Sequence, residues 1–132
     1  MSATPDIELH MFSADAIYVQ VFADRFVAFN SDSGVRAEAQ RDPASVSPRM
    51  LIADFAVAQE QIKALVNTVR RGLRAPHLLM HPMERIEGGI TQVEHRVFVE
   101  LGLGAGASRV RVHSGEVLAG DAIRQAIQDL KD

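Results

Sequence analysis

The sequence contains no cysteine, no long apolar run and no excess of basic residues. Without cysteine the chain cannot form disulfides, use a catalytic thiol or build a zinc site from thiolates. No apolar segment approaches the roughly 18 residues that a bilayer-spanning helix needs, and the first residues lack the basic and apolar regions of a secretory signal. With 14 basic and 17 acidic residues the net charge is -3, which gives no electrostatic attraction for nucleic acid. We therefore expect a cytoplasmic protein that neither inserts into membranes nor binds nucleic acid.

A length of 132 residues is typical of one globular domain. Apolar residues make up 47% and charged residues 23% of the sequence, as in an ordinary soluble protein, and the length is sufficient to bury a core. The sequence has no internal repeat and no linker, so residues 1–132 are predicted to form a single domain. Residues 1–14 are predicted to be irregular or flexible. They include Pro5 and two acidic residues but none of the Lys or Arg that a membrane-surface helix would present.

Five strands are expected. Residues 16–22 are β-branched and aromatic and residues 25–30 are nearly continuously apolar, which favours two strands joined by a two-residue hairpin link. Residues 35–39 alternate strictly between apolar and polar, which is typical of a strand at or near a sheet edge. The other two predicted strands are residues 77–81 and residues 108–112.

A first helix is predicted from an apolar stripe with helical spacing, formed by Ile62, Leu65, Val66, Val69 and Leu73. Three basic residues follow the main part of this stripe: Arg70, Arg71 and Arg74. We interpret them as the last turn of the helix, where positive charge is favourable for the helix dipole. An anion-binding site is the alternative interpretation.

A second helix is predicted over residues 92–102. Thr91 and Glu94 have the spacing of a capping box, in which each side chain accepts a hydrogen bond from a backbone N–H at the start of the helix. Its expected apolar face is Val93, Val97, Phe98 and Leu101, and its expected end is the glycine series Gly102, Gly104 and Gly106. A closing amphipathic helix is predicted from Ile123, Ala126, Ile127 and Leu130.

The resulting order is three strands, then helix and strand in alternation, with a helix last. It is the ribonuclease H-like arrangement from which actin-type ATPases build each of their lobes. Four segments point to a particular family within this arrangement: "MFSAD" (11–15), "LIADFAVAQEQI" (51–62), "GGITQVEHRV" (88–97) and "GAGASRVRV" (104–112). In this order, they resemble the first lobe of the MreB family, the bacterial actin-like rod-shape-determining proteins. The second segment is similar to the family's "VIADFxVTExM", the third to "GxTxVERRA" and the fourth to "GAGAREVxL".

The sequence departs from this family at the residues that would handle nucleotide. The resemblance implies an Asp-Leu-Gly-Thr phosphate loop at the end of the first strand, but an ungapped comparison places Val19, Gln20, Val21 and Phe22 there. Valine cannot hold the water shell of a metal ion, and the bulk of Val21 and Phe22 would keep the backbone away from a phosphate. The family's Glu-Glu-Pro, whose acid is implicated in hydrolysis, is replaced by residues 114–116, with Glu116 one residue out of place.

The spacing of the residues along the sequence disfavours a two-metal nuclease, a metal site built from histidines, and a dinucleotide-binding motif. A two-metal nuclease needs clustered carboxylates, whereas Asp15, Asp24, Glu38 and Asp54 have no recognisable spacing. His77 and His81 lie on the same face of one strand, but about 13 Å apart, which is too far to share a metal; His95 and His113 are possible neighbours. The glycine series 102–106 resembles a dinucleotide fingerprint, but it follows a helix where the fingerprint requires a strand.

We therefore expect an α/β domain of ribonuclease H-like fold, with a five-stranded mixed sheet, a three-strand meander and helices on its faces. The function implied by the resemblance is a non-catalytic MreB-like interaction or assembly protein in cell-shape or cytoskeletal organisation, without cofactor or metal. The alternative is the nucleotide-binding half of a split actin-like ATPase that another chain completes. A protein partner or self-association is expected, and the candidate interface is the basic face of the fifth strand, formed by Arg109, Arg111 and His113.

Overall fold

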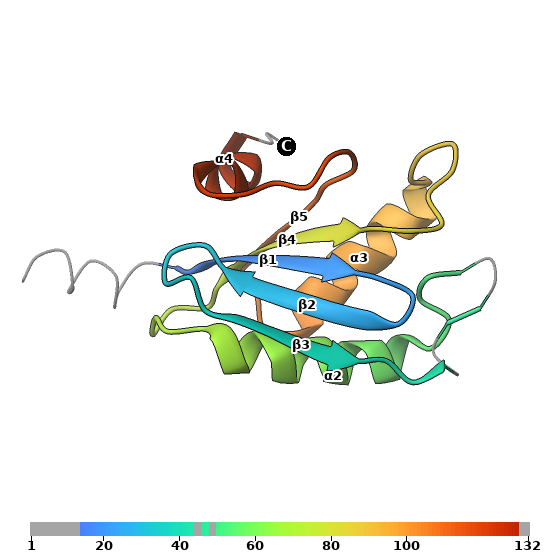
Figure 1. Cartoon of the computed structure of the whole chain (residues 1–132), viewed down its shortest axis with the longest axis horizontal. Helices are drawn as coiled ribbons and strands as arrows, with labels where there is room; N and C mark the ends of the chain where they lie inside the picture. The colour runs from blue at the N-terminus through green and yellow to red at the C-terminus, as the bar shows by residue number, and fades with distance from the viewer. Residues whose placement is uncertain (1–13, 44–45, 48–49, 130–132) are drawn as a thin grey trace, which may run out of the picture.

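The computed structural model describes residues 14–43, 46–47 and 50–129, and it shows an α/β fold with one five-stranded mixed sheet (Figure 1). The strands are β1 (Ala16–Val21), β2 (Arg25–Asn30), β3 (Arg36–Gln40), β4 (His77–Pro82) and β5 (Arg109–Val112), and the helices are α2 (Phe55–Val69), α3 (Gln92–Gly104) and α4 (Asp121–Asp129). The prediction for residues 1–14 lies outside the described residues except at Ala14. The same holds for Leu130, the last residue of the predicted closing stripe.

The sheet has the order β3-β2-β1-β4-β5, with β1 in the centre. β1 pairs antiparallel with β2, and β2 pairs antiparallel with β3, which confirms the meander. On its other side β1 pairs parallel with β4, which in turn pairs parallel with β5. Each parallel connection runs through a helix, as this geometry requires. All five strands were therefore predicted correctly to within one residue at each end.

The two faces of the sheet are covered unequally. The larger core lies between the sheet and the pair α2 and α3, and it contains Ile17, Val19, Ile62, Met80 and Leu101 among its fully buried side chains. On the opposite face, Ile123 and Ile127 of α4 pack against Tyr18 and Leu79 in a smaller core. None of the helices in the described ranges is both long enough and apolar enough to cross a membrane.

β3 is an edge strand, as its alternating pattern predicted. Ala37 and Ala39 pack against the larger core, whereas Arg36, Glu38 and Gln40 are exposed. Exposed charge on an edge strand opposes pairing with another chain. The edge at β3 is therefore protected by its own side chains.

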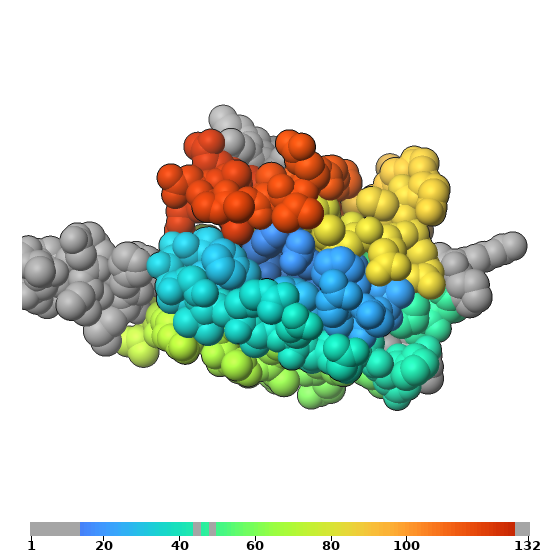
Figure 2. Space-filling model, viewed as in Figure 1, coloured from blue at the N-terminus to red at the C-terminus, as the bar shows by residue number. Residues whose placement is uncertain are grey.

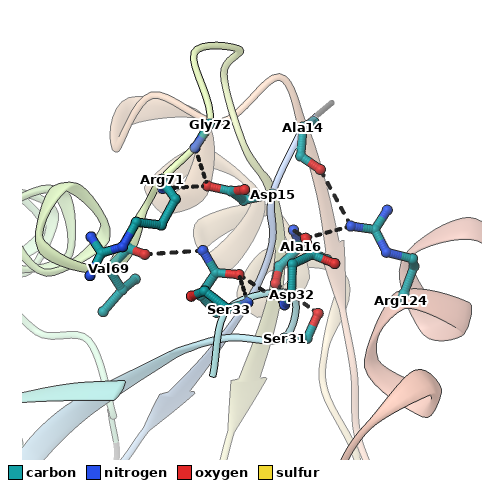
Figure 3. A network of polar contacts seen from close by, with 11 residues as sticks. Ala14, Asp15, Ala16, Ser31, Asp32, Ser33, Val69, Arg71, Gly72 and Arg124 are labelled. Carbon is teal, nitrogen blue, oxygen red and sulfur yellow. Dashed lines mark hydrogen bonds and ion pairs between the residues drawn. The ribbon is translucent and has the colours of Figure 1, made fainter. Parts of the chain in front are cut away.

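The predicted end of the first helix is wrong. α2 stops at Val69, so Arg70, Arg71 and Arg74 are not in its last turn, and Leu73 is 67% exposed. The buried carboxylate of Asp15 accepts hydrogen bonds from the backbone N–H of Arg71 at 2.6 Å and from that of Gly72 at 2.9 Å (Figure 3). In a longer helix those two N–H groups would donate to carbonyl oxygens of the preceding turn. Because they donate to Asp15 instead, a residue 56 positions before Arg71 ends the helix.

Asn30 completes this polar network at the amino end of β1. Its side-chain amide is fully buried, donates to the carbonyl oxygen of Val69 at 3.0 Å, and accepts from the backbone N–H of Asp32 at 2.9 Å. The carboxylate of Asp32 then accepts from Ala16 N–H at 3.1 Å and pairs with Arg124 of α4 at 2.6 Å (Figure 3). The β2–β3 turn, the start of β1, the end of α2 and α4 are thus tied together.

α3 begins as predicted but runs two residues further. Thr91 Oγ1 accepts from Glu94 N–H at 3.1 Å and the Glu94 carboxylate accepts from Thr91 N–H at 3.0 Å, which confirms the capping box. Phe98 and Leu101 are buried, but Val93 is 73% exposed, so its assignment to the core face was wrong.

Of the three glycines predicted to end α3, only Gly106 has that role, with a φ of +103° directly after the helix. Gly102 and Gly104 lie inside the helix. A Cβ atom on Gly102 would come within 2.6 Å of Val110 Cγ2 on β5. Gly102 therefore allows α3 to approach the sheet closely.

This contact predicts different effects for two neighbouring substitutions. Gly102→Ala should lower the free energy of unfolding by about 1–3 kcal/mol, because the branched Val110 side chain cannot move away within the core. Gly104→Ala is the matched control: its Cβ would meet only the end of the flexible Gln59 side chain, and alanine gains up to about 1 kcal/mol in helix propensity. Urea denaturation of both variants tests the difference, and equal midpoints would contradict the close-approach explanation.

Candidate functional site

The candidate site is the carboxyl end of the parallel strands β1 and β4, where Val21 and Pro82 are register partners. The β1–β2 hairpin and the loop that follows β4 lie side by side there, because Met83 N–H donates to the carbonyl oxygen of Val21 at 2.9 Å. The resemblance to the MreB family placed the positions of a phosphate loop at Val19 to Phe22, at the start of this hairpin. Open α/β sheets bind their ligands outside the carboxyl ends of their strands, so this end is where a site is expected.

The four residues at the predicted phosphate-loop positions form regular strand and turn. Val19 and Val21 are fully buried in the larger core, and β1 continues through Val21. Gln20 is partly buried on the other face, with its amide nitrogen 3.9 Å from Met83 Sδ. Phe22 begins the hairpin, and the guanidinium of Arg25 lies 3.8 Å from the centre of its ring. The backbone therefore turns in a tight hairpin here and leaves no extended loop.

The polar backbone groups of this hairpin are bonded within the chain. Phe22 N–H donates to Arg25 O at 2.9 Å, and Ala23 N–H donates to the Glu84 carboxylate at 2.9 Å. The carbonyl oxygen of Phe22 accepts from Arg41 Nη1 at 2.9 Å. A bound phosphate would need such N–H groups as donors. At Ala23 a carboxylate of the protein already takes the place that an anion would have.

Arg41 closes this end of the sheet from the β3 side. Its guanidinium stacks over the Phe26 ring at 4.4 Å, and its backbone N–H donates to Asp24 O at 3.0 Å. Burial, followed by the charge of Arg85, lowers the pKa of Arg41 to about 10, while Glu84 acts in the opposite direction. The group is still charged at neutral pH, so Arg41 is a structural cation that crosses from β3 to the hairpin.

Arg85 has an unusual backbone conformation for its residue type, with a φ of +58°. A non-glycine residue in the left-handed region costs about 1–2 kcal/mol. Its side chain lies 3.7 Å from the carboxylate of Glu84, the residue that bonds the hairpin. Among the described residues, Arg85 is the one non-glycine residue with a positive φ, and it lies three residues after the end of β4.

An apolar hollow of about 90 Å³ lies beside this turn, between the segment 50–52, the loop after β4 and the start of α3. Its walls include Leu51, Ile86, Ile90 and Val97, and Glu84, Arg85 and Glu94 are its charged members. Met50 and Val93, which also line it, are 54% and 73% exposed. The hollow can accept an apolar side chain.

The carboxylates considered for a nuclease have structural partners, and Asp24 and Glu38 both lie beside Arg25. Asp15 holds the end of α2, Asp54 accepts from Val57 N–H at the start of α2, and Asp24 pairs with Arg25 at 2.8 Å. Glu38 pairs with Arg36 at 2.7 Å. Within the described ranges, no three His, Asp or Glu side chains are grouped as a metal ion would require.

The histidines form a contact that the sequence analysis only partly anticipated. His81 is buried, with Nδ1 2.5 Å from the Tyr18 hydroxyl and Nε2 3.1 Å from the carbonyl oxygen of Gly115. His113 lies against it, with ring centres 4.6 Å apart. His81 is thus a satisfied core histidine, as expected. The alternation of β1 and β4 places Tyr18 and His81 on the same face, but only the fold brings His113 to them.

The interface predicted on β5 stays a prediction, and the structure places its three residues in different surroundings. Arg109 is exposed and Arg111 is half-buried, whereas Val110 is buried, so the alternation of the strand is confirmed. His113 is not part of an open basic face, because its ring packs on His81 and its Nε2 lies 2.9 Å from Glu116 O. Glu116, the displaced acid of the family motif, is itself exposed.

Comparison with protein-family models gives no match, and comparison with characterised protein sequences gives none either. The resemblance to the MreB family therefore depends on the four segments quoted above.

The hydrogen bond between Ala23 and Glu84 predicts a local loss of stability. Glu84→Ala should lower the free energy of unfolding by about 1 kcal/mol, because it leaves the part-buried Ala23 N–H without its acceptor. Glu87→Ala removes the same charge from an exposed position in the same loop and should have little effect. Urea denaturation measures both, and equal destabilisation by the two substitutions would show that charge, and not this bond, is responsible.

Proposed function

We propose that this chain is a non-catalytic MreB-like protein that acts as an interaction or assembly module in cell-shape or cytoskeletal organisation. The observation that carries the proposal is the closed hairpin at the end of β1. Val19 and Val21 lie in the core, and the Ala23 N–H is bonded to Glu84. Where the family resemblance would require a phosphate loop, the chain has used its own groups to complete the fold.

The proposed fold is the ribonuclease H-like one. Three features support it: a meander of three antiparallel strands, the central position of β1, and two following strands that pair parallel through helical connections. Fold alone does not assign a function, so the biological context comes from the MreB resemblance. The proposal that the chain is non-catalytic depends on the closed hairpin at the end of β1.

The first prediction from this proposal concerns nucleotide. ATP or ADP with Mg²⁺ should show no saturable binding tighter than about millimolar, a binding free energy of about 4 kcal/mol, because Phe22 N–H and Ala23 N–H are already bonded within the chain and the acid of the hairpin, Asp24, is paired with Arg25. Isothermal titration calorimetry and a phosphate-release assay on the full chain are the measurements. Saturable binding in the micromolar range would favour the alternative, a split actin-like ATPase.

The second prediction concerns self-association. β5 is an edge strand with exposed Arg109, and this cation can pair with an acidic group of a second copy. Sedimentation velocity up to about 100 µM should show a reversible oligomer that Arg109→Glu weakens and that added salt weakens too. Arg36→Glu, the same change on the exposed side of the opposite edge strand, is the control. A strict monomer, or an oligomer insensitive to Arg109→Glu, would remove this edge as the interface.

A further inference from the structure

A buried chain of hydrogen bonds connects the sheet to the segment that follows β5. His81 of β4 is 1% exposed. Its Nδ1 contacts the Tyr18 hydroxyl at 2.5 Å, and its Nε2 contacts Gly115 O at 3.1 Å. The Tyr18 oxygen also accepts from the backbone N–H of Leu118 at 3.2 Å. One histidine and one tyrosine therefore hold both ends of residues 115–118 against the sheet.

The partners determine where the protons are. A carbonyl oxygen can only accept, so the proton of neutral His81 must be on Nε2, facing Gly115. Nδ1 is then an acceptor, and the Tyr18 hydroxyl donates to it while accepting from Leu118. Every donor in this chain has one acceptor. A second proton on Nδ1 would have to donate to the Tyr18 oxygen, so the Tyr18 hydroxyl proton would lose its acceptor on His81.

His113 makes a second proton unfavourable for another reason. Its ring meets that of His81 edge-on, with centres 4.6 Å apart, and its Nε2 lies 2.9 Å from Glu116 O. Two imidazolium groups at this separation would repel each other with little water between them. In the described part of the chain, no carboxylate forms an ion pair with either histidine.

The other ionisable groups on the strands and helix around His81 do not offset this repulsion. β4 contributes His77, β5 contributes Arg111, and the segment after it contributes the exposed Glu116. α4 contributes the exposed Asp121 and also Arg124, which is paired with Asp32. The residues that touch His81 are thus neutral or basic.

The segment held by these contacts carries the second layer of the fold. It leads directly into α4, whose Ile123 and Ile127 form the small core with Tyr18 and Leu79. Figure 2 shows the segment and α4, coloured orange to red, lying against the blue of β1. Among the described residues this core has five buried members, so the connection that precedes α4 contributes to holding the helix on the sheet.

We propose that Tyr18, His81 and His113 form a proton-sensitive latch, which holds residues 113–118 and α4 on the sheet at neutral pH and releases them in acid. Release exposes Tyr18 and Leu79, an apolar strip on the face of the sheet that α4 otherwise covers. The proposal is independent of the function proposed above, because it requires neither a partner nor an MreB ancestry.

The direction of the pH effect follows from the environment of His81. Burial lowers the pKa of His81 below its ordinary value of 6.5, and the charge of His113 lowers it further, against a smaller opposing effect of the Gly115 carbonyl. The released state then binds more protons than the closed state as the pH falls below 6.5, so closure is weakened in that range. Burial and nearby arginines also lower the pKa of His77, so His77 requires a control.

Amide hydrogen exchange on the full chain tests the latch, with the Leu118 N–H as a direct reporter. After correction for intrinsic exchange, its protection should fall by up to about tenfold between about pH 7.5 and about pH 5.5, the most that one histidine with its ordinary pKa of about 6.5 in the released state can contribute. The amide of Val19 in the centre of the sheet should stay protected, which separates local release from global unfolding.

Three glutamine substitutions distinguish the latch from general acid sensitivity. His81→Gln should abolish the pH dependence, His113→Gln should reduce it and raise the pKa of His81 measured by NMR of its ring, and His77→Gln should leave it unchanged. The His113→Gln measurement stands even if His81→Gln does not fold. Leu118 protection that is equal at both pH values in the wild type, or a His81 pKa that does not respond to His113→Gln, would overturn the proposal.

Discussion

The arrangement of the whole domain depends on two buried polar side chains at the amino end of β1. Asp15 accepts from the N–H groups of Arg71 and Gly72, and Asn30 donates to Val69 O. These bonds satisfy the backbone where α2 ends, which would otherwise be costly to bury. They also fix the direction of the chain into β4, because His77 N–H donates to Asp15 O at 2.8 Å. The parallel pairing of β4 with β1, and hence the position of everything after it, follows from this connection.

The opposite end of the same sheet is closed by different means. Glu84 and Arg41 bond the N–H of Ala23 and the carbonyl oxygen of Phe22, so the end where an open α/β sheet usually receives its ligand is occupied by the protein's own charges. Two hollows remain open beside it. One is the apolar hollow at the start of α3, with exposed Met50 and Val93, and the other is a more polar one of about 610 Å³ whose lining includes Asp24, Arg41 and Arg85. Exposed apolar surface such as that of the first hollow is typical of contact with another macromolecule, and it is compatible with the proposal of an interaction module.

The two faces of the sheet differ in how they are held. α2 and α3 share a large core with β1 and β4, in which removal of any element would expose many apolar side chains. Within the described residues, α4 contributes two buried isoleucines to the smaller core, and it is also held by Arg124 and by the contacts of Tyr18 and His81. Elements with few buried apolar contacts open at the lowest free energies. Motion in this domain is therefore expected on the α4 face, where the histidines are.

The sequence by itself determined the elements, because their signals are local. Alternation identified β3, β-branched and aromatic runs identified β1 and β2, and Thr91 with Glu94 marked the start of α3. The tertiary structure decided what depends on residues distant in sequence. Asp15 ends α2 before its arginines, Val110 makes Gly102 a packing residue of α3, and parallel pairing brings His113 to His81. For the candidate site, the sequence predicted only that Val19, Gln20, Val21 and Phe22 cannot form a phosphate-binding loop. That Glu84 fills it could not be read from the sequence, because a carboxylate 61 positions away from Ala23 meets it only when β4 has paired with β1.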